Sequence, residues 1–152
     1  MFLLQLLQRR EIEAGVIAPL LAAFAREVGE TRAREIVAGV VRELAREAGC
    51  AAAAHGNTLA HFKTTVTKWT EGGALELTVL RDDETALEFD VTRCRFAEMY
   101  ARLGLAHLGG ALSCARDEAL IEGFNPAIEL TRTQTIMEGA PHCDFRFRAK
   151  PV

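Results

Sequence analysis

The first helical segment is recognised by the spacing of its apolar side chains. Over about 4–28 the apolar positions recur every three to four residues, which places them on one side of a helix. These positions are Ile12, Val16, Leu20, Ala23, Phe24 and Val28. Pro19 is expected to kink this helix or to break it in two, because proline lacks a backbone N–H and clashes with the preceding turn. Gly29 predicts its end.

Two further helices are predicted in the first half of the chain. The first begins near Thr31 and ends at Gly49 or in the alanine run at 51–54. Its apolar stripe consists of Ile36, Val37, Val40, Val41 and Leu44. The second covers about 58–70, with Thr58 or the preceding asparagine as its N-cap. Its apolar face consists of Leu59, Phe62, Val66 and Trp69.

In the second half the pattern changes from helical to alternating. Residues 75–79 and 87–91 each place an apolar side chain at every second position, and a charged segment at 81–84 separates them. Two alternating runs around a short polar tip are typical of a β-hairpin.

Two shorter helices and a second hairpin complete the pattern. The helices are expected over about 94–103 and 110–122, separated by a Gly-Gly pair. Strands at 127–137 and 142–149, joined by a turn that contains glycine and proline, form the second hairpin. The predicted fold class is therefore α+β, with an antiparallel sheet of two hairpins packed against a set of helices.

Length and composition indicate one domain over residues 1–152, with a helical half at 1–72 and a mixed α/β half at 73–152 that carries the candidate site. Hydrophobic residues make up 49% and charged residues 26%, a composition that excludes a disordered chain. The formal net charge of −3 argues against a nucleic-acid-binding protein, which is normally basic. No apolar run approaches the roughly 18 residues of a membrane span, so no membrane partner is expected.

The apolar segment at 2–7 bears on partners and location. Gln5 interrupts it and Arg9 follows it, so we interpret the segment as the start of an amphipathic helix or a partner contact rather than as a secretory signal. A homodimer through the N-terminal helices is compatible with this interpretation. Without a signal, a cytoplasmic location is predicted, where thiols stay reduced and are available for packing, catalysis or metal binding.

The cysteines are the most informative residues for chemistry. Cys94 starts a helix or ends a strand. A thiol at the start of a helix has a lowered pKa because the helix dipole favours the thiolate; Glu98, one turn later, opposes that effect. Cys114 and Asp117 are three residues apart on a predicted helix, so the carboxylate can accept the thiol proton or orient a water. Arg116 is expected to point elsewhere. The alternative for each thiol is a small buried apolar side chain.

A third cysteine begins the last predicted strand. Alternation places Cys143 on one face of the strand, with His142 and Asp144 on the other, which disfavours a dyad between these neighbours. A base from another element, such as Asp117, is then required. Alternatively, three thiols could ligate zinc together with Asp117, Asp144 and His142, although the chain has no C-x-x-C pair.

Five short motifs follow one another in the second half of the chain. They are FDVTRCRFAEMY at 89–100, LSCARD at 112–117, GFNP at 123–126, LTRTQTIMEG at 130–139 and HCDFR at 142–146. Over about 85–148 they jointly resemble the L-2-amino-thiazoline-4-carboxylic acid hydrolase family. The N-terminal half resembles the family only in its helical pattern.

The resemblance implies a hydrolase that opens a small five-membered ring at the carbon between nitrogen and sulfur, giving a carbamoyl-cysteine on a bacterial route to cysteine. Such a reaction needs a nucleophile, proton transfer to the leaving atom and a group that holds the substrate carboxylate. The catalytic candidates are Cys94, Cys114, Asp117, Cys143 and Asp144. The substrate-binding candidates are Arg132, for the carboxylate, with His142 and Asn125, although Asn125 also suits a turn.

No cofactor is required by this chemistry, and the expected partner is the small-molecule substrate. The alternative function is a small-molecule or metal-binding module without turnover, which would use the same Cys/Asp/His pocket between helices and sheet.

Overall fold

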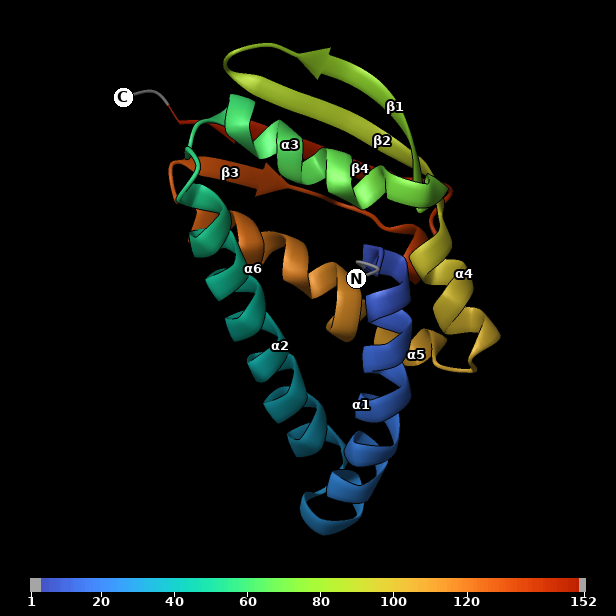
Figure 1. Ribbon diagram of the computed structural model, residues 1–152. Helices are drawn as coiled ribbons and strands as arrows, with labels where there is room; N and C mark the ends of the chain where they lie inside the picture. The colour runs from blue at the N-terminus through green and yellow to red at the C-terminus, as the bar shows by residue number, and fades with distance from the viewer. Residues whose placement is uncertain (1–3, 151–152) are drawn as a thin grey trace.

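A single antiparallel sheet forms one end of the molecule, with helices against one of its faces (Figure 1). The computed structural model describes residues 4–150. The strands run in the order β1-β2-β4-β3. Their bounds are Leu75–Asp82 for β1, Ala86–Cys94 for β2, Ile128–Thr131 for β3 and Cys143–Ala149 for β4. The predicted α+β class with an antiparallel sheet is therefore confirmed.

The first predicted hairpin is β1–β2, and it closes on Asp83, whose side chain accepts hydrogen bonds from the backbone N–H groups of Thr85 and Ala86. Pairing of β2 with β4, with Phe89 opposite Phe145, joins the two halves of the sheet.

The second hairpin is shorter than predicted. β3 ends at Thr131, and the predicted strand over 132–137 is wrong. The N–H groups of Thr133 and Gln134 donate to the carboxylate of Asp144, so they are not available to continue a ladder. A 3₁₀ turn at Ile136–Glu138 follows.

One face of the sheet is covered by α3 (Leu59–Thr70) and α6 (Ala115–Phe124). Thr58 caps α3, as predicted, by accepting a hydrogen bond from the N–H of His61. Aromatic rings fill this interface: the centroids of Phe62 and Phe147 lie 4.8 Å apart. The other face of the sheet carries polar side chains, among them Glu88, Asp90, Arg146 and Arg148.

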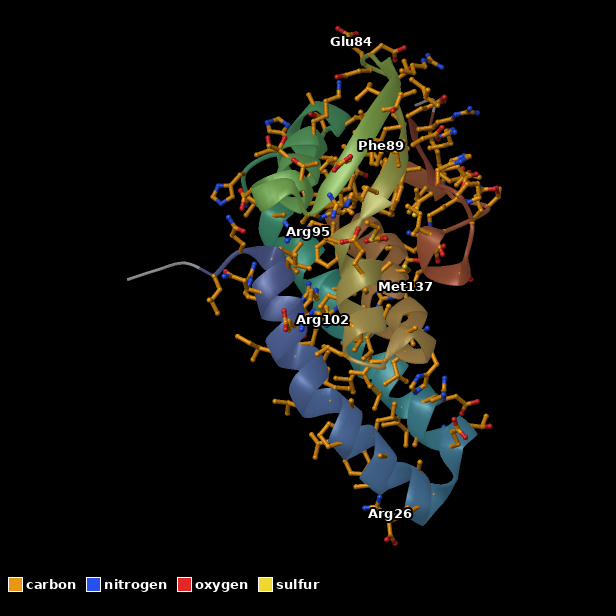
Figure 2. The ribbon with its side chains drawn as sticks, turned by 90° about the vertical axis from the view of Figure 1, so that its right-hand side faces the viewer. Arg26, Glu84, Phe89, Arg95, Arg102 and Met137 are labelled. Carbon is orange, nitrogen blue, oxygen red and sulfur yellow. The ribbon has the colours of Figure 1, made fainter. Side chains whose placement is uncertain are left out.

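The two long helices α1 (Leu6–Val28) and α2 (Glu30–Ala53) form a hairpin that extends away from the sheet (Figure 1). Figure 2 shows Arg26 at its tip, at the opposite end of the molecule from Glu84 in the β1–β2 turn. The prediction of a break at Pro19 is wrong, since α1 runs through it; Pro19 is exposed and buried side chains hold the turns on both sides. The hairpin turns at Gly29, whose φ of 86° favours glycine.

The predicted apolar stripe of α1 is not its buried face, and that of α2 is buried only at Val37 and Val41. Leu7, Ala14, Ile17 and Leu21 of α1 pack into the core, whereas the predicted stripe members are largely exposed. On α2 the buried row consists of Ala33, Val41, Ala45 and Gly49. Small residues form this row because α2 and α6 approach backbone to backbone.

Two glycines make this approach of α2 and α6 possible. A Cβ on Gly49 would lie 2.1 Å from the carbonyl oxygen of Leu120. A Cβ on Gly123 would lie 2.1 Å from the carbonyl oxygen of Arg46. The close crossing fixes the hairpin to the helix that leads into the sheet.

The segment between the hairpins is more helical than predicted. After α4 (Arg95–Arg102), the chain runs from α5 (Ala106–Gly109) through a π-helical turn at Gly110–Cys114 into α6. The predicted separation at the Gly-Gly pair is therefore wrong. Glycine is needed at 109 because a Cβ there would lie 2.2 Å from the sulfur of Met137. No helix within residues 4–150 is long and apolar enough to cross a bilayer.

Candidate functional site

A cavity of about 80 Å³ lies between the covered face of the sheet, the start of α1 and the segment from the π-helical turn into α6. Leu6, Trp69, Leu75, Val91 and Phe145 are among its apolar lining residues. Its charged and thiol-bearing lining residues are Arg10, Cys94, Cys114, Arg116, Asp117, Arg132 and Cys143. The volume is well below that of a pocket for a drug-sized molecule, so the ligand is small.

Three thiols reach this cavity from three elements. Pairing of Val91 with Cys143 places the start of β4 beside the end of β2, where Cys94 caps α4. Cys114 comes from the end of the π-helical turn, a kind of distortion that is frequent at functional sites. The fourth thiol, Cys50, is exposed on α2 and does not line the cavity.

The cavity keeps these thiols protonated. Burial raises the pKa of Cys94 to about 11, although the N–H of Ala97 donates to its sulfur at 3.4 Å and opposes the shift. Burial and the carboxylate of Asp117 raise the pKa of Cys114 to about 12, and burial also raises the pKa of Cys143. The sequence-based expectation of a lowered pKa for Cys94 is therefore wrong, because desolvation outweighs the helix terminus.

Asp117 and Arg132 form a mostly buried ion pair in the cavity wall. The distance between Asp117 Oδ2 and Arg132 Nη1 is 2.5 Å, and only 9% of the arginine side chain is exposed. The guanidinium also donates to the carbonyl oxygen of Cys114 and lies 4.9 Å from the ring centroid of Phe145. Burial raises the pKa of Asp117 to about 6 although Arg132 acts to lower it. This carboxyl group therefore changes protonation close to neutral pH.

Two arginines that sequence reasoning did not assign to the site also line the cavity. Arg116 was expected to point elsewhere, and the structure contradicts this: its Nε donates to the carbonyl oxygen of Leu112 and its Nη2 to Glu13. Arg10 donates to the same glutamate. One signal was available, since Arg10 lies between Leu7 and Ala14 at the spacing of the buried face of α1.

Three candidates lie outside the cavity. Asp144 accepts hydrogen bonds from the 133–134 loop on the outer side of the sheet. His142 Nε2 lies 3.8 Å from an oxygen of Asp90. Asn125 spans a turn, accepting from the N–H of Ala127 and donating to the carbonyl of residue 57. Strand alternation and the turn after α6 account for these positions, and Asp144 helps to hold the loop that follows Arg132.

Within residues 4–150, no group of three or more histidine, cysteine, aspartate or glutamate side chains is arranged to hold a metal ion. The three thiols thus share a cavity without forming a ligand set among the described residues.

Comparison with known families adds to this geometry. A sequence profile for L-2-amino-thiazoline-4-carboxylic acid hydrolases matches residues 9–147. The chain belongs to this family. The match extends the resemblance seen over 85–148 to nearly the whole chain, so the α1–α2 hairpin is part of the hydrolase family's pattern. No curated protein matches the sequence.

Two solved structures resemble this family member in fold. The phenol-responsive sensory domain of the transcription activator PoxR with phenol shares 14% identity, with a TM-score of 0.51, over 98% of this chain and 76% of that one. A trafficking protein particle complex subunit 3 from Naegleria fowleri, covalently bound to palmitic acid, shares 12% identity over 94% and 96% of the two chains, with a TM-score of 0.47. At 14% identity the likeness to the PoxR domain concerns the fold alone.

Proposed function

We propose that the protein hydrolyses a small cyclic amidine-like carboxylate, such as L-2-amino-thiazoline-4-carboxylate, to a carbamoyl-cysteine. Membership of the family suggests a hydrolase. The observation that carries the proposal is that Cys114 and Asp117 line one small cavity, with a carboxyl pKa of about 6. A carboxyl group with this pKa can both accept and donate a proton near neutral pH.

In the proposed first step, the sulfur of Cys114 bonds to the ring carbon between nitrogen and sulfur while Asp117 accepts the thiol proton. The ring C–S bond breaks, and the leaving sulfur takes a proton from Asp117. The substrate carbon is then held on Cys114 as an isothiourea. Water attacks this carbon, the bond to the sulfur of Cys114 breaks, and the water oxygen becomes the carbonyl oxygen of the carbamoyl product. One proton of the water restores the thiol of Cys114 and the other goes to the product nitrogen, so that one water is consumed in total.

The raised thiol pKa values shape this proposal. A neutral thiol is a weak nucleophile, so attack depends on a base within the cavity. Asp117 lies one helical turn after Cys114 and supplies that base. A protonated amidine beside Cys114 would also favour the thiolate, because a nearby positive charge lowers the pKa of a thiol. The substrate thus assists activation of the group that attacks it.

One observation favours the alternative of a binding module without turnover. All three cavity thiols are held protonated in the free protein, as is typical of packing cysteines rather than reactive ones. The two functions differ in whether the ring of a bound thiazoline is opened.

The test measures loss of L-2-amino-thiazoline-4-carboxylate and appearance of carbamoyl-cysteine by mass spectrometry. Wild type and Cys50→Ser, an exposed thiol outside the cavity, are expected to turn over equally. Cys114→Ser is expected to lose about 10³-fold or more in rate, as for removal of a nucleophile. Full activity of Cys114→Ser with loss in Cys143→Ser would move the nucleophile to Cys143. Binding without product in wild type would establish the alternative.

A further inference from the structure

Two guanidinium groups at one end of the cavity converge on a single carboxylate. Arg10 of α1 donates from Nη1 to both oxygens of Glu13, at 2.7 and 2.8 Å. Arg116 of α6 donates from Nη2 to Glu13 Oε2 at 3.0 Å. The exposed fractions of the two arginine side chains are 18% and 11%, whereas that of Glu13 is 39%. The two cations are thus mostly enclosed and their partner is the more accessible group.

Glu13 does not occupy all the donors of this pair. A guanidinium carries five N–H groups. Arg10 uses Nη1, and Arg116 uses Nε and Nη2. Within residues 4–150 no fully buried side-chain nitrogen or oxygen lacks a hydrogen-bond partner, so the remaining guanidinium nitrogens are reached by solvent. Both side chains line the cavity.

The charges around the cavity do not balance. Asp117 compensates Arg132, and Glu13 compensates one of the two remaining guanidiniums, so one positive charge is left over. This excess lies inside a chain whose formal net charge is −3. Burying an uncompensated charge is costly, and an anionic ligand removes that cost. Arg132, the carboxylate-binding candidate from the sequence, is already occupied by Asp117 and the carbonyl of Cys114.

We propose that Arg10 and Arg116 form the carboxylate subsite of the cavity. The inference rests on the proposed function and names the part of the site that selects a carboxylate-bearing ring. A guanidinium binds a carboxylate through two parallel N–H···O bonds. Arg116 lies directly before Asp117 and two residues after Cys114 in the chain. Because Cys114, Arg116 and Asp117 line the same cavity, a carboxylate held by Arg116 keeps the attached ring in the cavity that contains the groups proposed to act on it.

The test compares two substrates in matched variants. L-2-amino-thiazoline-4-carboxylate carries the anion, and 2-amino-thiazoline lacks it. Arg116→Met is expected to lower kcat/KM for the carboxylate substrate by about 10- to 100-fold, which is the usual effect of losing a charge-assisted hydrogen-bonded pair. The kcat/KM for 2-amino-thiazoline is expected to stay unchanged. Arg102→Met, on an exposed arginine paired with Glu11, is the control and should alter neither. Equal loss on both substrates in Arg116→Met would overturn the subsite.

A second variant, Glu13→Gln, is expected to strengthen binding of the carboxylate substrate instead of weakening it. Glu13→Gln removes the internal carboxylate and leaves both guanidiniums free, so KM for the carboxylate substrate is expected to fall several-fold. A purely structural role of the Arg10–Glu13–Arg116 cluster would give a raised or unchanged KM, and this result would contradict the proposal.

Failure of the subsite can be told apart from failure of the proposed function. If wild type opens neither ring, the hydrolase proposal fails. Calorimetric binding of the thiazoline carboxylate then decides the subsite on its own. Binding that Arg116→Met abolishes and Arg102→Met retains supports the subsite, whereas equal affinity in the two variants overturns it.

A separate observation concerns the far end of the molecule, where large apolar side chains are exposed. Residues 14–25 of α1 contain no charged or polar side chain, so this part of the helix is apolar on all sides. A helix of that kind is normally buried all round. The exposed apolar side chains of the hairpin have exposed fractions of 43–57% and are Ile12, Val16, Leu20, Phe24, Val28, Ile36, Val40 and Leu44.

The size of this apolar surface matches a protein interface. Side chains of this kind that are about half exposed together present on the order of 600 Å². A stable interface buries roughly 800 Å² on each partner, including its polar rim. Monomeric proteins rarely expose more apolar surface than this in one region.

The charges of the hairpin favour a second copy over a membrane surface. Residues 26–47 contain five arginines and five glutamates and therefore have no net charge. Helices that lie on anionic membranes carry an excess of lysine and arginine, which is absent from this segment of the sequence. A segment with both signs in equal number can instead pair with itself about a two-fold axis. We infer that two copies of the chain associate through the α1–α2 hairpins.

Light scattering coupled to gel filtration tests the dimer with the full chain. Wild type is expected to have the mass of two copies at micromolar concentration, and Leu20→Glu that of one. Leu80→Glu is the control, because Leu80 is exposed to a similar degree on β1, far from the hairpin tip. A monomeric wild type, or binding of monomers to phosphatidylcholine–phosphatidylserine vesicles instead, would overturn this inference. So would dissociation by Leu80→Glu alone.

Discussion

The cavity and the α1–α2 hairpin depart from the usual distribution of side chains in opposite directions. In the cavity, charged groups such as Arg116 and Asp117 are mostly buried. On the hairpin, apolar side chains such as Leu20 and Val40 are about half exposed. Each arrangement costs free energy in an isolated chain, since one removes charge from water and the other leaves apolar surface in it. The two proposals account for these costs by a second molecule, a small anion in the carboxylate subsite and another copy of the chain on the hairpin.

The two regions also differ in what a substitution should change. Cavity residues are coupled to one another through short ion pairs, so the loss of one group leaves another unpaired. Hairpin residues on the exposed rows contact little within one chain, so their loss should affect association rather than folding. The following substitutions test this difference, beginning with the largest expected effect.

Asp117→Asn should give the largest change in activity. Asparagine has a similar shape but cannot accept the thiol proton, so the ring-opening rate is expected to fall by about 10³-fold. The measurement is single-turnover kinetics with the thiazoline carboxylate. Glu118→Gln, its exposed neighbour, is the control and should keep the wild-type rate. A loss of less than tenfold in Asp117→Asn would remove the proposed base.

Arg132→Met should give a large change in stability. Without the guanidinium, Asp117 is left in a mostly buried position with no ion partner, which is expected to lower the free energy of unfolding by about 3 kcal/mol at pH 8. The loss should be smaller at pH 5, where the carboxyl group can be neutral. Urea unfolding at both pH values measures this. Arg148→Met, on an exposed arginine, is expected to change the free energy by less than about 0.5 kcal/mol.

The pH dependence of wild-type stability should show the raised pKa of Asp117. The folded protein holds this proton up to about pH 6, whereas the unfolded chain releases it near 3.8. The folded state thus binds more protons in between, and the contribution of Asp117 to the free energy of unfolding falls as pH rises from about 4 to 6. Asp117→Asn should lack this part of the slope. An identical slope in variant and wild type would show that the pKa is not raised.

The smallest expected effect on stability is that of substituting the exposed Leu20, and the buried Leu21 next to it provides the matched contrast. Leu20 is exposed and Leu21 is 7% exposed on the same helix. Leu21→Ser is expected to cost about 2–4 kcal/mol of monomer stability, through a cavity and a buried hydroxyl. Leu20→Ser should cost less than about 0.5 kcal/mol in dilute samples, where the monomer dominates. Equal losses measured by urea unfolding would mean that the two side chains are buried alike.

The sequence predicted element types better than helix orientation. Alternation around Asp83 predicted the first hairpin, because period-two burial leaves a clear signal when one face of a strand is polar. The buried and exposed faces of α1 could not be told apart by periodicity. Residues 14–25 are apolar all round, so periodicity does not distinguish the face toward α2 from the exposed face. In the buried row of α2 only Val41 was predicted, because the other members are alanine and glycine, which a search for large apolar side chains passes over.

The candidate site was predicted in part. Cys94, Cys114, Asp117, Arg132 and Cys143 line one cavity. Position and spacing had singled out the three cysteines and Asp117, and the resemblance added Arg132. Spacing could not reveal that Arg116 reaches the cavity, because the π-helical turn before it changes the direction of the following side chains. Asp144 and His142 lie outside, where strand alternation had already placed them opposite Cys143. Their assignment to the site came from the resemblance and not from the pattern.

The contact of Gly49 and Gly123 with backbone atoms has a mechanical consequence. No side chain lies between α2 and α6 at these two points, so there is no soft layer to absorb a rotation of one helix against the other. α6 continues directly from the turn that carries Cys114, and its first turn carries Asp117. In the proposed dimer, a tilt of α2 would therefore move α6 with it, and with α6 the turn that carries Cys114 and Asp117.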